Sequence, residues 1–295
     1  MRRANCMRWT GLAALALAAL ALGGAWAIGS QMTSPGASAV DAASPPARDF
    51  VLTSEDGLSI AATYWPGAAT NAPAVLLLHG LDGSRMQVIA NAAWLSRLGY
   101  AAMAIDFRGH GQSTSAPRSI GWNEARDAHA AFDWLKQSQH NAQVAVLGIS
   151  QGGAAALLGK AGPLPADALI LQAVYPDIRH AVRNRIAARV GVAPAILLEP
   201  LISYQSLPRF GLWPSELDPL KTLRSFHNPV LVIGGGADLF TPPDETRAMY
   251  EAAPGVKELW LAPGLDHSGV SDLQTEEYRM KVAAFLKMTI APPLP

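Results

Sequence analysis

Short apolar runs alternate with amphipathic stretches along most of the chain. Two alternating segments, 50–53 and 59–65, flank Glu55-Asp56-Gly57 and predict an antiparallel hairpin. A wholly apolar run, typical of a strand buried on both faces, follows at 74–78. Further mostly apolar runs predict strands at 100–105, 144–147, 168–174, 230–233 and 258–261. Apolar residues at helical spacing lie between them, at 88–98, 124–136, 244–252 and 272–288. This alternation predicts an α/β fold with a mostly parallel central sheet and helices on both faces.

One segment, at about 176–228, interrupts this order because it contains no recognisable strand. A structureless loop of that length would be unusual in a compact domain, so we predict a helical cap inserted between two strands. Its first part carries four arginines, which are Arg179, Arg183, Arg185 and Arg189. We interpret them as a solvated helix face, and an anion-binding site is the alternative.

The first 29 residues differ in character from the rest. Three arginines, Arg2, Arg3 and Arg8, precede an uncharged stretch rich in Leu and Ala at 11–29. A positive flank before an apolar run is typical of export or anchoring. Two alternatives remain open: a signal peptide cleaved at Ala25-Trp26-Ala27, or an uncleaved transmembrane helix that associates the protein with a membrane.

Both alternatives place the rest of the chain outside the cytoplasm, either periplasmic or extracellular, or anchored in the membrane. Residues 30–48 are mostly Ser, Pro, Ala and Gly and predict a flexible linker. The folded domain is then expected at 49–290, because 295 residues that are half hydrophobic can fill one large α/β core.

Composition excludes several classes of partner. The formal net charge is zero and no basic face is visible, which argues against nucleic-acid binding. Cys6 is the only cysteine, so a disulfide framework or a thiolate metal cluster is not expected. The seven histidines are scattered without the spacing of a metal site, and we expect no metal.

A candidate nucleophile lies in the motif Gly148-Ile149-Ser150-Gln151-Gly152. The motif follows the apolar run 144–147 and precedes an alanine-rich segment at 154–158, which is the strand–turn–helix context of a nucleophile elbow. The glycines are needed because side chains would collide in so sharp a turn. The pattern therefore predicts that the Ser150 hydroxyl faces a substrate.

A serine nucleophile needs a base, and the base needs an orienting acid. In α/β folds ligands gather at the carboxyl ends of the strands, and elbow serines are followed in the chain by the acid and then the histidine. Asp238 follows the run 230–233, and His267 follows the run 258–261. Asp177 also follows a predicted strand and is the alternative acid, although Asp238 is favoured.

Four motifs together resemble the serine α/β-hydrolase family, in the group related to serine aminopeptidases and lysophospholipases. They are Leu78-His79-Gly80, Asp106-Phe107-Arg108-Gly109-His110-Gly111-Gln112-Ser113, the Ser150 elbow, and the Asp238 and His267 loops. The resemblance covers about residues 50–288. It implies an α/β-hydrolase fold with Ser150 as nucleophile, His267 as general base and then acid, and Asp238 as orienting carboxylate.

The resemblance also implies an oxyanion hole formed by the backbone N–H groups of Leu81 and Gln151, and a mechanism without a cofactor. The remaining polar residues of the motifs are interpreted as structural. His79 and His110 would shape their loops, Asp106 and Arg108 would form an ion-paired turn, and Asp266 adjoins His267 too closely to orient its ring.

These residues predict an exported serine hydrolase that cleaves carboxylic esters or thioesters of a small-molecule acyl substrate through an acyl-enzyme. One alternative is a serine aminopeptidase or amidase, whose substrate amine would need acidic cap residues. Glu199, Glu216 and Asp218 are the candidates, but basic residues outnumber them. A non-catalytic ligand-binding protein of the same fold is the alternative from a different class.

Overall fold

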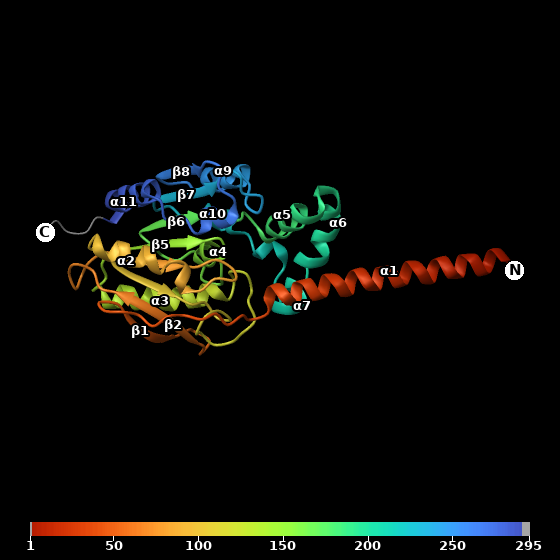
Figure 1. The fold of residues 1–295 in the computed structure, drawn as a ribbon, viewed down its shortest axis with the longest axis horizontal. Helices are drawn as coiled ribbons and strands as arrows, with labels where there is room; N and C mark the ends of the chain where they lie inside the picture. The colour runs from red at the N-terminus through yellow and green to blue at the C-terminus, as the bar shows by residue number, and fades with distance from the viewer. Residues whose placement is uncertain (1, 291–295) are drawn as a thin grey trace.

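The centre of the molecule is one eight-stranded sheet, in a computed structural model that describes residues 2–290 (Figure 1). The strand order is β1-β2-β4-β3-β5-β6-β7-β8. The strands are β1 (Arg48–Thr53), β2 (Ser59–Trp65), β3 (Ala74–Leu78), β4 (Ala101–Ile105), β5 (Val144–Ile149), β6 (Ala168–Gln172), β7 (Val230–Gly235) and β8 (Lys257–Ala262). Strands β1 and β2 form an antiparallel hairpin, as their pattern predicts, and β2 also pairs antiparallel with β4. The other neighbouring strands are parallel.

Each predicted strand is present, with small differences at the ends. β6 ends two residues earlier than its apolar run, because Ala173 has a φ of 53° and cannot continue an extended strand. β7 continues two residues further than predicted, pairing Gly234 and Gly235 with β8. The mostly parallel sheet predicted from the sequence is confirmed.

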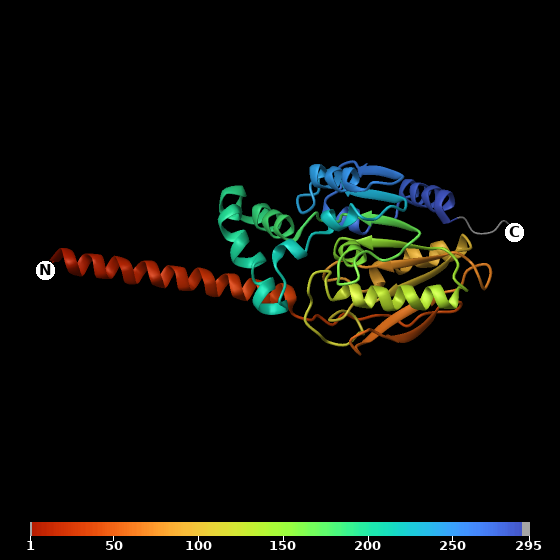
Figure 2. The ribbon, with the colours of Figure 1, turned by 180° about the vertical axis from the view of Figure 1, so that it is seen from behind.

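Helices cover both faces of the sheet (Figures 1 and 2). The side chains of Leu76 and Leu78 pack on one face, and those of Val75 and Leu77 pack on the other. The first face is covered by α3 (Glu124–Ser138), α4 (Gln151–Leu157), α8 (Pro219–Leu223) and α9 (Pro243–Ala252), and the second by α2 (Ile89–Arg97) and α11 (Glu276–Ile290). Burial on both sides explains why β3 and β4 are wholly apolar.

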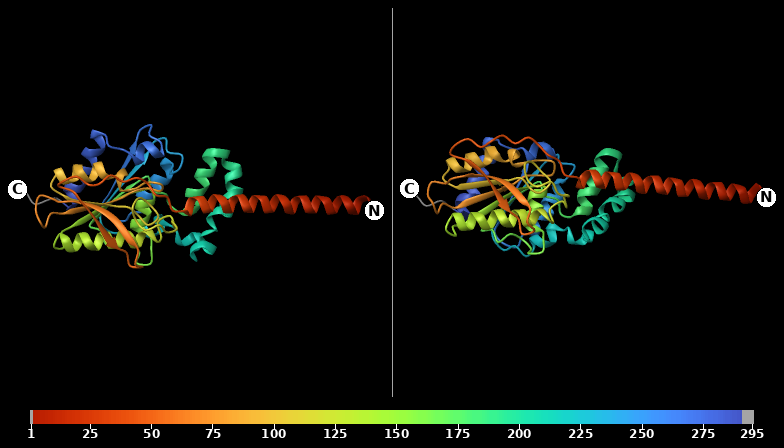
Figure 3. Two further views of the ribbon diagram at one scale, coloured as in Figure 1. Left: turned by 60° about the horizontal axis from the view of Figure 1, so that its bottom comes forward. Right: turned by 90° about the horizontal axis from the view of Figure 1, so that it is seen from below.

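The segment between β6 and β7 is helical. It contains α5 (Ile178–Val190), α6 (Val192–Ser203), α7 (Ser206–Phe210), the 3₁₀ turn η2 (Pro214–Glu216) and α8. Figure 3 shows α5 and α6 beyond the end of the sheet. The chain reverses between them at Gly191, whose φ of 93° suits glycine. We call α5, α6, α7 and η2 the cap.

Two of the four arginines of α5 form ion pairs with the neighbouring helix, in addition to facing solvent, and Arg189 is exposed as expected. Arg179 and Arg183 both reach the buried carboxylate of Glu199 on α6, at 3.0 Å and 3.6 Å. Helix α6 is hydrophobic on most of its surface and packs against α5, so this side of α5 is an interface between two helices. The sequence pattern could not show where the partner carboxylate lies, because Glu199 is sixteen residues or more away.

The N-terminal segment forms one long helix, α1 (Arg2–Thr33), which projects away from the domain (Figures 1 and 3). Its second half contacts the cap. The Nε2 amide of Gln205 donates to the carbonyl of Ala25 at 2.9 Å, and the Arg209 guanidinium lies 4.0 Å from the centre of the Trp26 ring. Helix α1 therefore continues past residue 29, to Thr33, into the segment expected to be a linker.

Within the part of the chain that the structure describes, no helix is both long enough and apolar enough to cross a membrane.

Candidate active site

Ser150 lies in a strained turn between β5 and α4. Its φ of 48° and ψ of −110° are unfavourable for a residue with a side chain. Its backbone N–H donates to the carbonyl of Gln172 at 2.7 Å, which fixes the turn against β6. A Cβ added to Gly152 would lie 2.3 Å from the carbonyl oxygen of Leu78, and one added to Gly148 would lie 2.5 Å from Gly153 Cα. The motif glycines are thus required by close backbone approach.

Asp238 and His267 meet on the loops after β7 and β8. The Nδ1 atom of His267 lies 2.8 Å from Oδ2 of Asp238, whose side chain is fully buried. The other contacts of the carboxylate are donated by Phe240 N–H at 2.7 Å, Thr241 N–H at 2.9 Å and the Thr241 hydroxyl at 2.6 Å. An ionised carboxylate only accepts, so the Nδ1 proton of His267 points to Asp238 and the Nε2 lone pair is left for a second proton.

Burial alone would raise the pKa of Asp238, but the hydrogen bonds from His267 and Thr241 hold this pKa below its ordinary value. The carboxylate therefore stays ionised at neutral pH and can orient the imidazole and stabilise its protonated form.

Gln172, at the end of β6, connects the serine turn to the histidine loop. Its backbone carbonyl accepts the Ser150 N–H, and its side-chain Nε2 donates to the carbonyls of Val270 at 2.5 Å and Ser271 at 3.2 Å. These carbonyls belong to α10 (His267–Ser271), the short helix that begins with His267. The hydroxyl of Tyr278 donates to Gln172 Oε1 at 3.0 Å. Sequence reasoning missed this residue, although an amide at the end of a wholly apolar strand was an available signal.

The two expected oxyanion donors lie on neighbouring strands. Leu81 follows β3 and Gln151 begins α4 directly after β5, and β3 pairs with β5 in register. Among the described residues, neither backbone N–H has an acceptor. The loop before Leu81 is held by a hydrogen bond of 2.9 Å from Gly80 N–H to Gln87 Oε1, in the 3₁₀ turn η1 (Arg85–Gln87). Two free N–H groups, one at a helix N-terminus, can stabilise a developing oxyanion.

The two other histidines considered in the sequence hold backbone in place. His79 is fully buried, with Nδ1 2.7 Å from the carbonyl of Gly80 and Nε2 accepting from Phe107 N–H at 3.1 Å. Burial is the main cause that lowers the pKa of His79 to about 3. His110 Nδ1 lies 2.9 Å from the carbonyl of Arg108. Both contacts agree with the structural role expected of these imidazoles.

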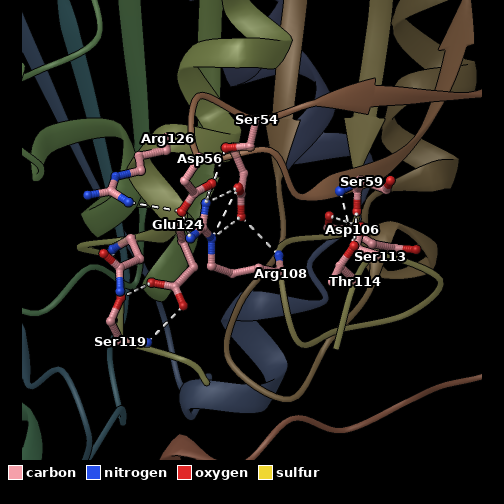
Figure 4. A network of polar contacts seen from close by, with 12 residues as sticks. Ser54, Asp56, Ser59, Asp106, Arg108, Ser113, Thr114, Ser119, Glu124 and Arg126 are labelled. Atoms are coloured by element: carbon pink, nitrogen blue, oxygen red, sulfur yellow. Dashed lines mark hydrogen bonds and ion pairs between the residues drawn. The ribbon is translucent and has the colours of Figure 1, made fainter. Parts of the chain in front are cut away.

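The expected ion pair between Asp106 and Arg108 is wrong. Asp106 pairs with the buried guanidinium of Arg85, whereas Arg108 reaches Asp127 at 2.7 Å and Asp56 at 2.6 Å. Figure 4 shows Arg108 meeting Asp56 from the β1–β2 turn, with Asp106 directed to the other side. The two residues flank one position of the turn after β4, so their side chains diverge toward different neighbours.

Asp177 and Asp266 serve as helix caps. Asp177 Oδ1 accepts from the N–H of His180 at 2.9 Å at the start of α5, and its Oδ2 lies 2.6 Å from His180 Nδ1. Asp266 Oδ1 accepts from Gly269 N–H at 2.8 Å at the start of α10. The structure therefore joins His267 to Asp238 and joins Asp177 to a different histidine.

Comparison with known proteins agrees with this fold. A family model described as serine aminopeptidase S33 matches residues 69–207. An uncharacterised protein of Mycobacterium tuberculosis is 32% identical over 240 residues, which cover 79% of this chain and 78% of the relative. The chain belongs to the serine α/β-hydrolase family.

Two characterised proteins resemble parts of this hydrolase. An esterase of Pyrococcus furiosus superposes with a TM-score of 0.69 at 23% identity, covering 88% of this chain and 98% of the esterase, and confirms the α/β-hydrolase fold. The lysophosphatidylserine lipase ABHD12 of Rattus norvegicus is 34% identical over 127 residues, which are 41% of this chain and 31% of the lipase.

Proposed function

We propose that this hydrolase cleaves carboxylic esters or thioesters through an acyl-enzyme, with Ser150, His267 and Asp238 as its catalytic triad. The observation that carries the proposal is the 2.8 Å contact between His267 Nδ1 and the buried Asp238 carboxylate. Gln172 connects this pair to the strained turn that presents Ser150.

In the first half of the reaction, Ser150 Oγ attacks the acyl carbonyl carbon while His267 Nε2 takes the hydroxyl proton. The carbonyl oxygen becomes an oxyanion and accepts hydrogen bonds from the N–H groups of Leu81 and Gln151. The bond to the leaving alcohol or thiol then breaks, and the imidazolium returns the proton to it. Water attacks the acyl-enzyme in the same way, releasing the acid and restoring the serine.

The cap supports an ester substrate over a peptide amine. The three acidic residues considered for binding a substrate amine, two in the cap and one directly after it, already have hydrogen-bond or ion-pair partners. Glu199 is paired with Arg179, Glu216 accepts the N–H of Trp213 at 2.7 Å, and Asp218 accepts the N–H of Lys221 at 2.8 Å. An aminopeptidase would need a carboxylate available for the substrate ammonium.

The proposal is tested by fluorophosphonate labelling and ester hydrolysis. Wild-type protein should be labelled and should hydrolyse p-nitrophenyl acyl esters faster than aminoacyl p-nitroanilides. Ser150→Ala should lose labelling and about 10⁴-fold or more in hydrolysis. Ser215→Ala, at an exposed serine of the cap, is the matched control and should behave as wild type.

Equal labelling of Ser150→Ala and wild type would contradict the nucleophile assignment. A folded wild-type protein that neither reacts with the probe nor hydrolyses esters would favour the non-catalytic alternative, and faster cleavage of the anilides would favour the amidase.

We also propose that the N-terminal segment directs export, because its arginines precede an uncharged run. The contacts that Ala25 and Trp26 make with the cap favour retention of the segment, since cleavage after Ala27 would remove them. Fractionation of expressing cells, with mass spectrometry of the N-terminus, tests both points. A cytoplasmic location would refute export, and a mature chain beginning at Ile28 would refute retention.

A further inference from the structure

A cavity of about 630 Å³ opens beside the oxyanion loop. It is bounded by the second half of α1, by the cap helices α5 and α6, and by Leu81 and Asp82. Its walls are mainly aliphatic and include Ala25 and Ile28 from α1 and Ile186 and Ile202 from the cap. The size and lining suit an aliphatic chain whose reacting end lies near Leu81.

A cationic side chain lies in this aliphatic wall. Arg185 is half-buried, and its Cζ atom is 5.0 Å from the centre of the Phe240 ring. Its Nη1 donates to the carbonyl of Ala181 at 3.2 Å. No carboxylate of the described residues lies within ion-pair distance of this guanidinium. Burial lowers the pKa of Arg185, but an arginine remains protonated, so a positive charge without an ion-pair partner lies in the cavity wall.

This charge is close to the reacting groups. Phe240 lies under the Arg185 guanidinium, and the centre of its ring is 5.3 Å from that of His267. The N–H of Phe240 also donates to Asp238. The Phe240 ring therefore lies between the guanidinium, which lines the cavity together with Leu81, and the imidazole of the proposed catalytic base.

Most of the other charged side chains nearby have an ion-pair partner. On the same helix, Arg179 and Arg183 pair with Glu199, while Arg189 lies exposed at the rim of the cavity. Asp82 is the only acidic residue among those lining the cavity, and Arg118 pairs with it at 2.5 Å. The cavity thus combines aliphatic walls with an excess of positive charge from α5.

We propose that Arg185 binds an anionic group of the ester substrate, so that this hydrolase prefers esters with an aliphatic chain and a carboxylate or phosphate. This inference rests on the proposed ester hydrolysis. A guanidinium can accept either anion through two parallel hydrogen bonds, which is the geometry that favours arginine over lysine at such sites.

The test compares charged and neutral esters of equal chain length. The carboxylate arm uses the mono-p-nitrophenyl ester of octanedioic acid against its methyl-capped diester. The phosphate arm uses 1-octanoylglycerol 3-phosphate against 1-octanoylglycerol, with release of octanoic acid as the readout. Whichever arm shows the preference identifies the anion that the site accepts.

Wild type should favour the charged ester of at least one arm by tenfold or more in kcat/KM. Arg185→Gln should lower kcat/KM for that ester by about 10- to 100-fold, the range for losing hydrogen bonds to a charged group, and leave the neutral ester within about threefold. Arg185→Lys should retain part of the preference because it keeps the charge. Arg224→Gln removes an exposed arginine away from the cavity and is the matched control, with no expected effect.

A wild-type protein without preference for either charged ester would overturn the inference while leaving ester hydrolysis intact. An equal loss on charged and neutral esters in Arg185→Gln would also overturn it, since that result indicates a packing role. Failure of wild type to hydrolyse any of the four esters, with no fluorophosphonate labelling, would instead refute the proposed function itself.

Discussion

Replacing Asp238 by Asn should reverse the proton arrangement on His267. The Oδ1 position is fixed by the two backbone N–H donors of Phe240 and Thr241, so the amide NH₂ group must take the Oδ2 position. That position faces His267 Nδ1 at 2.8 Å. An amide donates there, so Nδ1 must become the acceptor and the proton moves to Nε2.

With its proton on Nε2, His267 can no longer accept the Ser150 proton. The same loss of the correct tautomer in an established triad lowers kcat by about 10⁴-fold, equivalent to about 5 kcal/mol of transition-state stabilisation. We expect Asp238→Asn to lose about 10³- to 10⁴-fold in kcat on a p-nitrophenyl ester. KM should change little, because Asp238 is fully buried behind the imidazole.

Asp177→Asn is the matched control, since it makes the same chemical change at the alternative acid. Asn is also a good N-cap, so this variant should keep its thermal stability and lose less than tenfold in kcat. Circular dichroism would establish that both variants are folded. The reasoning fails if folded Asp238→Asn keeps kcat within tenfold of wild type, or if Asp177→Asn shows the larger loss.

Three further predictions concern the surroundings of the site. Gly152→Ala places a methyl group 2.3 Å from the backbone oxygen of Leu78. The overpacking should lower the free energy of unfolding by about 1–3 kcal/mol, and a displacement of the Ser150 turn by about 1 Å should lower kcat about 100-fold. An unchanged melting temperature and kcat would contradict this. Gln172→Met removes the amide that connects the serine turn to α10. We expect kcat to fall about 10- to 100-fold with little change in KM. A lower melting temperature with a normal kcat would show that the amide stabilises the fold without positioning the site. Hydrogen bonding to Arg108 is the main cause that lowers the pKa of Asp56 from 3.8 to about 2, so its ion pair contributes stability above pH 3.8 that is lost as pH falls toward 2. Because Asp56 is partly exposed, Asp56→Asn should cost about 1 kcal/mol in urea denaturation at pH 6 and almost nothing at pH 2, and an equal loss at both pH values would refute the assignment.

Local patterns of the sequence were sufficient for the sheet, its two helical layers and the turn at Ser150. A strand buried on both faces must be apolar throughout, and a helix with one buried face must repeat its apolar residues every three or four positions. The elbow is local in part, because the contacts that exclude a side chain at Gly148 come from Gly152 and Gly153, whereas those at Gly152 come from Leu78 and His79. The position of His267 and Asp238 after later strands was predictable because parallel strands end at one edge of the sheet.

Tertiary structure decided which charged groups meet. Asp106 and Arg108 are neighbours in sequence but pair with Arg85 and Asp127, and Glu199 neutralises arginines that the sequence pattern placed in solvent. Such pairings depend on side-chain directions and on contacts between distant segments, which no periodicity records.

By itself the sequence determined the fold class, the sharp turn at Ser150 and the loops that carry Asp238 and His267, because each follows from the local pattern of one strand, one turn or one loop. Only the tertiary structure brought Gln172 to the helix of His267 and left Arg185 without a carboxylate in a cavity walled by α1. The physical reason is that a hydrogen bond or an uncompensated charge depends on what surrounds a group in space. That environment is created when segments far apart in the sequence pack together.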